Sequence, residues 1–275
     1  MEPSDYGPIV ARALAEDLAD VGDLTSKWVV PETATSHAAL VARAGGVIAG
    51  MPVAGYVFDR VDATLEFSGV EDGSAVVAGE AIGYVSGSSR SILTAERTAL
   101  NLLGRMSGVA TATARLVAAV SGTPARITDT RKTMPGLRVL DKYAVVAGGG
   151  VNHRMGLYDE VMIKDNHIVA AGGLGAALTA VREGVGSDVR VIVEVENLGQ
   201  LGEVLATDAD RVLFDNMDVE TLRRAVEMVD GAMETEASGG VTVETVRPIA
   251  ETGVEFISVG WITHSAPQLD IALDF

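Results

Sequence analysis

The C-terminal half of the chain alternates between short apolar runs and longer stretches with helical periodicity. The apolar runs predict strands, because they are short and rich in β-branched residues. These strands are predicted at 126–129, 161–164, 191–196, 211–215, 233–238 and 256–260. Helices are predicted between them at 173–183, 197–206, 218–229 and 242–251, the last with Thr242 as N-cap. Such alternation predicts parallel strands with right-handed crossovers, either in an α/β barrel short of eight units or in an open doubly wound sheet.

The N-terminal part of the chain has a different pattern. Helical periodicity predicts one helix over 8–20 and a longer one over 91–121, broken near Gly104 or Gly108. Between these helices, residues 36–86 contain short apolar runs separated by Gly, Pro and Asp-Gly turn signals. This pattern is typical of strands, so we expect a strand-rich region before the α/β region.

The predicted α/β strands end on polar or small residues. α/β barrels carry their chemistry at the carboxyl ends of their strands. One polar strand end is ordinary turn chemistry, but six of them favour a site. The ends are Asp129, Lys164-Asp165, Glu194 and Glu196, Asp215-Asn216, Ser238-Gly239-Gly240, and Gly260.

The positive charge of the chain is gathered in one segment. The whole chain carries a net charge of −17, which disfavours nucleic acid as a partner. The segment from Arg131 to His167 contains six Lys or Arg and four acidic residues, a net of +2, which leaves −19 for the rest. A basic segment in an acidic chain predicts an anion site, because Arg pairs bidentately with carboxylate and phosphate. Surface ion pairs are the alternative interpretation.

The composition also limits where the protein works. There are no cysteines, which excludes disulfides and a thiol nucleophile and suits a cytoplasmic protein. No apolar run approaches the roughly 20 residues that span a bilayer. Acid richness with only four lysines predicts a halophilic source, and a GC-rich genome explains it equally well.

Two features of the strand ends fit a phosphorylated ligand. Glu194 and Asp215 follow consecutive predicted strands and could hold ribose hydroxyls or Mg²⁺, unless one of them pairs with Lys164 or Arg131. The ASGGVT segment (237–242) leads into a predicted helix, whose N-terminal N–H groups would suit phosphate.

Several segments of the chain, taken in order, resemble those of quinolinate phosphoribosyltransferases. The DTRKT…GGGVNHR…IKDNH block is the most specific of them, and the N-terminal AEDLADVGDLTS is similar to that family's opening. The resemblance therefore spans nearly the whole chain. The segments are LTAERTALNLLGRMSGVATAT, TDTRKTMPGLRVLDKYAVVAGGGVNHRMGLYDEVMIKDNH, VEVEN, LFDN, EASGG and VGWITHS.

The resemblance implies a fold and an assembly. Residues 1–110 would form an α/β sandwich domain, rejoined by the C-terminal tail 266–275. Residues 111–265 would form an incomplete, TIM-like α/β barrel of about six to seven strands. A homodimer or dimer-based oligomer is implied, in which the N-terminal domain of one subunit faces the barrel mouth of the other.

The resemblance also implies a reaction. Quinolinate and phosphoribosyl pyrophosphate would give nicotinate mononucleotide, pyrophosphate and carbon dioxide, with Mg²⁺. The ring nitrogen attacks the anomeric carbon, and loss of the 2-carboxylate leaves a carbanion stabilised by the cationic nitrogen. This route needs no covalent enzyme intermediate, although a Schiff base on Lys164 is a rival role.

Residue roles follow from the same resemblance. The cations would bind quinolinate and the phosphates, the two carboxylates would hold ribose and metal, and Lys132, Lys164, Glu194 and Asp215 would be the catalytic set. Quinolinate would contact Arg131, His153, Arg154 and Lys164, with Arg97 entering from the partner subunit; phosphoribosyl pyrophosphate would contact Lys132, Lys164, Ser238, Gly239, Gly240, Gly260 and His264.

Other residues have less specific interpretations. Asp141 and Trp261 depart slightly from the family's pattern, away from the expected chemistry. The remaining expectations are a surface position for His37, a core position for Trp28, a capping or ligand role for His167, an ion-pair or substrate role for Lys142, and loop positioning by Asp129 and Thr130.

Two rival functions stay open at this point. A paralogue on the same fold, either ModD-type or a nicotinate-type transferase, would act on a different substrate. A non-catalytic protein that binds a phosphorylated metabolite would keep the fold alone. The cationic set with Arg97 favours a dicarboxylate, and retention of Lys132 and Glu194 favours catalysis.

Overall fold

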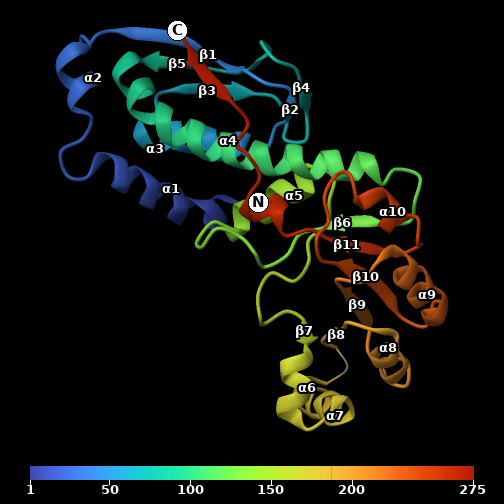
Figure 1. Ribbon diagram of the computed structural model, residues 1–275. Coiled ribbons are helices and arrows are strands. Elements are labelled where there is room, and N and C mark those ends of the chain that lie inside the picture. The colour runs from blue at the N-terminus through green and yellow to red at the C-terminus, as the bar shows by residue number, and fades with distance from the viewer. Residues whose placement is uncertain (187) are drawn as a thin grey trace. The chain divides into compact units, whose positions relative to one another are not determined.

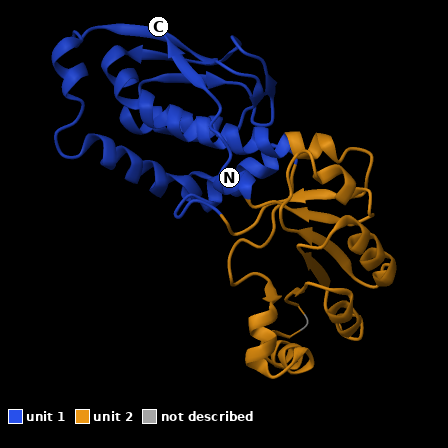
Figure 2. Cartoon of the chain, viewed as in Figure 1, with its two compact units in different colours: residues 1–114, 133–149, 261–275 blue, residues 115–132, 150–260 orange. Residues whose placement is uncertain are grey.

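The computed structural model describes residues 1–186 and 188–275. The chain divides into two compact units, shown in different colours in Figure 2. Unit 1 comprises residues 1–114, 133–149 and 261–275, and unit 2 comprises 115–132 and 150–260. The segment 133–149, which we expected in the barrel domain, clusters with unit 1 instead.

Unit 1 contains a four-stranded antiparallel sheet. The strand order is β12-β1-β5-β3, formed by Ile271–Asp274, Thr35–Ala42, Ala81–Ser88 and Glu66–Gly69. β12 pairs with β1, with Leu273 opposite Leu40, so the C-terminal tail completes a sheet that begins near the N-terminus. A separate pair is formed by β2 (Gly46–Val47) and β4 (Ala75–Val76).

Helices α1, α3 and α4 lie on one side of the four-stranded sheet of unit 1 (Figure 1). One of them, α3, falls in the region 36–86, which we expected to be strand-rich and for which we predicted no helix. Its buried Val53 and Val57 are four residues apart and make one apolar helical face. The helices of unit 1 are α1 (Pro3–Leu18), α2 (Leu24–Val29), α3 (Met51–Val61), α4 (Ser89–Ala119), α5 (Arg138–Ala147) and α11 (Trp261–His264).

α4 runs without interruption through both of its glycines, so the predicted break is wrong. The glycines serve packing instead. A Cβ at Gly108 would lie 2.2 Å from the carbonyl oxygen of Pro267, and one at Gly104 would lie 3.0 Å from that of Leu269. Their missing side chains let the C-terminal segment approach the helix, where the Leu269 N–H donates to the Gly104 carbonyl at 2.9 Å.

Unit 2 contains a six-stranded parallel sheet. Its order is β6-β11-β10-β9-β8-β7, and the strands are Arg126–Thr128, Phe256–Ser258, Glu234–Ser238, Arg211–Asp215, Val191–Val195 and Val161–Ile163. All six predicted strands are confirmed, and each of their ends lies within two residues of its predicted position. β6 carries one further parallel bridge, from Thr128 to Val151. The described strands thus form an incomplete barrel wall, with β7 at one edge.

Helices connect the strands of unit 2 as the alternation predicted. They are α6 (Asp165–Ala171), α7 (Leu174–Val185), α8 (Leu198–Val204), α9 (Val219–Val229) and α10 (Val246–Ala250), and Figure 1 shows α9 beside the sheet. α6 was not predicted. The predicted start of α10 is wrong, because Thr245 and not Thr242 is the N-cap. The Thr242 N–H donates to the Thr245 hydroxyl at 2.8 Å, within a turn that precedes the helix.

Two surface residues of unit 1 test single-residue expectations. His37 is exposed, as expected, and stacks on Tyr84 with ring centroids 5.3 Å apart. Trp28 is 77% exposed on the short helix α2, so its expected core position is wrong.

Across residues 1–186 and 188–275, no single helix has both the length and the apolar character to cross a bilayer. One bent pair, α6 with α7, meets the length and composition limits only when its two helices are taken together.

Gly108→Ala is expected to lower the free energy of unfolding by about 1–3 kcal/mol, because the new methyl group must displace the Pro267 carbonyl. Gly202→Ala in α8 is the matched control, since a Cβ there meets nothing within 4 Å. The control should gain roughly 0.5–1 kcal/mol. Urea unfolding of both variants checks this, and equal effects would contradict the close approach.

Candidate active site

The pairing register brings the predicted strand ends to one face and one edge of the parallel sheet. Ser238 lies opposite Asp215, and Glu194 lies opposite Leu213, two residues before Asp215. Because side chains alternate along a strand, Glu194, Asp215 and Ser238 point to the same side. Ser258 and Thr128 continue this row across β11 and β6.

Lys164 and Glu194 form an ion pair at this edge. Lys164 follows Ile163, whose partner Val193 precedes Glu194, so the register sets the two side chains side by side. The Lys164 Nζ bonds Oε2 of Glu194, and 42% of the lysine side chain remains exposed. The sequence had left open whether a strand-end carboxylate pairs with Lys164, and the structure shows that Glu194 does. The ion pair gives Lys164 a task in holding Glu194, whereas a Schiff base would require this lysine to give up that pair.

Arg154 and Arg131 lie within electrostatic range of each other. Burial lowers the pKa of Arg154, and the positive charge of Arg131 lowers it further, while Asp159 and Glu160 act in the opposite direction. The Arg154 Nη1 also donates to the Glu160 carbonyl at 3.0 Å. Arg154 is half-buried and Arg131 is exposed, and the repulsion between the two guanidiniums favours an anion near them.

The backbone beside these cations is fixed by a buried carboxylate. Asp129, fully buried after β6, accepts a hydrogen bond from the His153 N–H at 3.0 Å. Asp129 therefore positions the loop, the role that we favoured for it. Thr130 accepts from the N–H of the exposed Lys132 at 3.0 Å, which is also a positioning contact.

His153 is buried beside two protein groups. Its Nδ1 accepts a hydrogen bond from the Arg154 N–H at 2.7 Å, and its Nε2 lies 3.4 Å from Oε1 of Glu236. We expected His153 to contact quinolinate, and its side chain is only 5% exposed.

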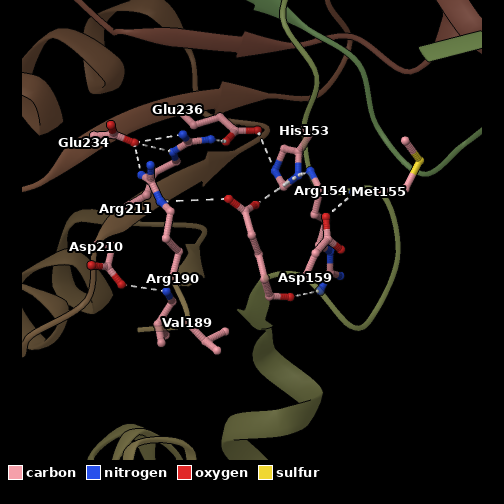
Figure 3. Close-up of polar contacts among 12 residues, drawn as sticks. His153, Arg154, Met155, Asp159, Val189, Arg190, Asp210, Arg211, Glu234 and Glu236 are labelled. Atoms are coloured by element: carbon pink, nitrogen blue, oxygen red, sulfur yellow. Dashed lines mark hydrogen bonds and ion pairs between the residues drawn. The ribbon is translucent and has the colours of Figure 1, made fainter. Parts of the chain in front are cut away.

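A closed ring of charged side chains lies beneath the sheet edge, and Figure 3 shows most of its contacts. Arg211 donates to Glu234 Oε2 from Nε at 3.0 Å and to Glu236 Oε2 from Nη1 at 2.9 Å. Arg190 bonds Glu234 and lies 3.8 Å from Glu160 Oε1. Glu160 Oε2 in turn lies 3.8 Å from His153 Nδ1. We call these six residues the charge ring.

Sequence reasoning missed most of the charge ring. Its signal was present, because Glu234 and Glu236 alternate within a strand whose other residues are apolar or small, and Arg211 begins the next strand in space. A charge at an inward strand position needs a partner when it is buried.

Glu236 stays ionised despite complete burial. Burial raises the pKa of its carboxyl, but the neighbouring His153 and Arg211 outweigh burial and hold that pKa below its usual range. Arg211 is held in turn over the ring of Phe256, 3.8 Å from its centroid.

The glycine-rich segment after β10 needs its glycines for steric reasons. Gly239 has a φ of +102°, and a Cβ there would lie 2.1 Å from Oδ1 of Asn216. Helix α10 begins only at Val246, so the expected helix N-terminus does not follow Gly240 and the predicted dipole contribution to phosphate binding is wrong there. Loop N–H groups of this segment and of Gly260, after β11, remain candidates for phosphate.

Two candidate residues belong to unit 1. Arg97 lies on α4, 67% exposed, with Glu96 at 3.9 Å. His264 ends α11, and its Nδ1 lies 2.6 Å from the Ser265 hydroxyl. The other candidates all belong to unit 2.

The structure also locates the residues whose roles the sequence left open. His167 accepts from the Lys164 N–H at 3.0 Å through Nδ1, which is the capping role. Lys142 is fully buried within α5, and its neighbour Asp141 accepts two hydrogen bonds from Arg105, at 3.0 and 2.8 Å. Trp261 begins α11 in unit 1.

In the described parts of the chain, no three His, Asp or Glu side chains converge as a metal site. Magnesium needs fewer protein ligands than this, because it keeps several waters and binds one or two carboxylates together with substrate phosphates. Glu194 and Asp215 on neighbouring strands supply oxygen donors of this kind.

Two family models cover nearly the whole chain. The N-terminal domain model of quinolinate phosphoribosyl transferase matches residues 23–107. The C-terminal domain model of the same family matches residues 109–274.

Named relatives match over most of their lengths. The quinolinate phosphoribosyltransferase [decarboxylating] 1b of Nicotiana tabacum is 43% identical over 98% of this chain and 82% of its own. The probable nicotinate-nucleotide pyrophosphorylase [carboxylating] of Bacillus subtilis is 42% identical over 94% of this chain and 89% of its own.

Solved structures agree with the fold. NadC from Streptococcus pyogenes superposes with a TM-score of 0.96 at 35% identity, over 100% of this chain and 97% of its own. The nicotinate-nucleotide pyrophosphorylase of Francisella tularensis gives 0.95 at 38% identity, over 100% and 97%.

Arg211→Met should destabilise the protein by about 3–5 kcal/mol, because it leaves buried Glu236 without its guanidinium. The loss should shrink as the pH falls through about 4.3, the usual Glu pKa, because the carboxyl of the variant then becomes increasingly neutral in both the folded and the unfolded chain. The exposed pair of Arg223 with Glu220 at 3.2 Å provides the control, since Arg223→Met should cost at most about 1 kcal/mol. Urea unfolding between pH 4 and 7 measures both; a small, pH-independent loss for Arg211→Met would contradict the buried pair.

Proposed function

Because the chain belongs to the quinolinate phosphoribosyltransferase family, we propose that it transfers phosphoribose from phosphoribosyl pyrophosphate to quinolinate with decarboxylation, in de novo NAD biosynthesis. One structural observation carries the proposal to the level of residues. The Arg131 and Arg154 charges act on each other, and Lys164 pairs with Glu194 at the carboxyl ends of β7 and β8 in the same unit. Cations and carboxylates are thus concentrated where an anionic sugar donor and an anionic acceptor must meet.

We propose that the guanidiniums bind the two carboxylates of quinolinate. Arg131 and Arg154 suit this role because a guanidinium pairs with a carboxylate through two parallel hydrogen bonds. Lys164, at the carboxyl end of β7, and His153 would contact the same substrate. Holding the ring nitrogen against the anomeric carbon can supply about 7–11 kcal/mol of the barrier reduction.

The sugar donor would lie along the carboxyl ends of the strands. Glu194 and Asp215 would accept hydrogen bonds from the ribose hydroxyls and are the residues that would hold Mg²⁺, which neutralises pyrophosphate charge when bound. Lys132 and Lys164 would stabilise charge that grows on the leaving pyrophosphate. The 5′-phosphate would contact Ser238, Gly239, Gly240, Gly260 and His264.

The chemistry balances without a covalent bond to the protein. The lone pair of the pyridine nitrogen forms the bond to C1′ as the bond from C1′ to the pyrophosphate oxygen breaks, and the nitrogen becomes cationic. The bond from C2 to its carboxylate then breaks, releasing carbon dioxide. Its electron pair stays on C2 beside the cationic nitrogen until a proton arrives there.

We propose further that the enzyme works as a homodimer in the cytoplasm, with Arg97 of each subunit entering the site of the other. The exposed guanidinium of Arg97, with Glu96 as a neighbour on its own helix, supports a role toward an external anion. The cysteine-free chain suits a reducing compartment.

Arg131→Ala is expected to weaken quinolinate binding by about 2–5 kcal/mol, roughly 30-fold or more, while phosphoribosyl pyrophosphate binding changes little. Arg126→Ala, which removes the same charge at the other end of β6, serves as the control and should leave both affinities near the wild-type values. Isothermal titration with each substrate separately measures them. Equal loss of both substrates in Arg131→Ala would show that the pocket is partitioned differently.

The wild-type protein should form nicotinate mononucleotide from quinolinate in a Mg²⁺-dependent coupled assay, releasing one carbon dioxide per turnover. Nicotinate should not replace quinolinate. Turnover of nicotinate without carbon dioxide release would instead identify a nicotinate-type transferase, and no turnover with either would favour a binding protein.

A further inference from the structure

Glu236 is the most deeply buried charge of the charge ring, and the proposed reaction gives it no task. It lies two residues before Ser238 on the same face of β10, directly below the expected phosphate contacts. One of its carboxylate oxygens accepts from Arg211 at 2.9 Å, and the other lies 3.4 Å from His153 Nε2. Glu236 thus connects the fixed sheet to the loop that carries Arg154.

The contacts of His153 define which ring nitrogen carries the hydrogen. Nδ1 accepts from the Arg154 N–H at 2.7 Å, so it must present a lone pair. Nε2 lies 3.4 Å from a buried carboxylate oxygen, an ion-pair distance without hydrogen-bond geometry, and a hydrogen on Nε2 is the arrangement that lets these two buried atoms satisfy each other. A neutral imidazole satisfies both demands in only one tautomer, the one protonated on Nε2.

We propose that Glu236 is a positioning residue for quinolinate binding, which holds His153 in the Nε2–H tautomer so that Nδ1 can fix the backbone of Arg154. The proposal rests on the proposed function for the role of Arg154, and on the geometry alone for the tautomer. Asp129 holds the His153 N–H from the other side at 3.0 Å, so residues 153 and 154 are fixed by two buried carboxylates.

Glu160 does not replace Glu236 in this role. Its Oε2 is 3.8 Å from Nδ1, beyond hydrogen-bond distance, and Nδ1 already accepts from the Arg154 N–H. A hydrogen on Nδ1 would point at that N–H group, where two donors would oppose each other. The carboxylate of Glu236 is therefore the acceptor that selects the tautomer.

Glu236→Gln tests the proposal with almost no change in volume. The Arg211 guanidinium demands an oxygen, so the Gln carbonyl should turn toward it and the amide NH2 should face His153. Nε2 must then accept, which forces the hydrogen onto Nδ1 or expels the ring. Either result removes the hydrogen bond to the Arg154 N–H.

¹⁵N NMR of labelled histidine reads the tautomer directly, and the chain has only four histidines to assign. The wild type at neutral pH should show His153 protonated on Nε2. Glu236→Gln should move the hydrogen to Nδ1 or give averaged shifts. A wild-type His153 protonated on Nδ1, or an unchanged tautomer in Glu236→Gln, would overturn the proposal, and the wild-type result holds even if the variant does not fold.

Steady-state kinetics provides the second readout, with Glu234→Gln as the matched control. Glu234 is two residues away, pairs with the same Arg211 and has the same charge, but the structure gives it no contact with His153. Glu236→Gln should raise the KM for quinolinate on the order of tenfold or more, because displacements of about 1 Å can cost about 100-fold. The KM for phosphoribosyl pyrophosphate should stay near wild type, and Glu234→Gln should show no such difference between substrates.

The double variant Arg211→Met with Glu236→Gln separates positioning from general damage. Without the guanidinium, the Gln carbonyl is free to accept from Nε2–H, so the tautomer and the quinolinate KM should return toward wild type. Failure to recover either, or the same selective KM increase in Glu234→Gln, would contradict the proposal. A wild type that shows the Nε2–H tautomer but never turns over quinolinate would instead count against the proposed function.

Discussion

Mutual repulsion between the two anionic substrates, quinolinate and phosphoribosyl pyrophosphate, is the constraint on which our account of this structure depends. Two like charges 4 Å apart repel by about 4 kcal/mol at an effective dielectric constant of 20, and a chain with a net charge of −17 adds to that repulsion. The parallel sheet places charged groups where this repulsion would act, because its register brings Lys164 and the strand-end carboxylates to one edge. The loops after β6 carry Arg131 and Arg154, whose charges act on each other and which we propose to bind the acceptor.

The charge ring below that edge shows how the Arg211 guanidinium can be buried with its charge paired. Buried ions are costly unless each is paired and hydrogen-bonded. Arg211 meets this condition by binding Glu234 and Glu236 at once while covering the face of Phe256. The ring passes from β9 and β10 through His153 to the loop of Arg154, so the rigid part of unit 2 reaches the residues proposed to bind substrate.

The alternation of strands and helices was predictable because it depends on local periodicity, and all six parallel strands are where the pattern placed them. Long-range packing was not. Gly104 and Gly108 looked like helix breaks, yet they permit a segment more than 150 residues later to contact α4. Lys164 and Glu194 were recognised from strand ends, whereas Glu236 sits inside a strand and needed the register to show that it faces His153. The predicted core position of Trp28 was wrong, because the residue type does not show whether other residues cover the side chain.

The most direct measurement of the central claim uses anions that cannot react. Phthalate has the two adjacent carboxylates of quinolinate but no ring nitrogen, and pyrophosphate with Mg²⁺ represents the leaving group. Isothermal titration of each in the absence and presence of the other should show that both bind to one subunit at once, with phthalate affinity falling as salt rises. Strictly competitive binding, or phthalate affinity independent of salt, would contradict a site that holds two anions together by gathered positive charge.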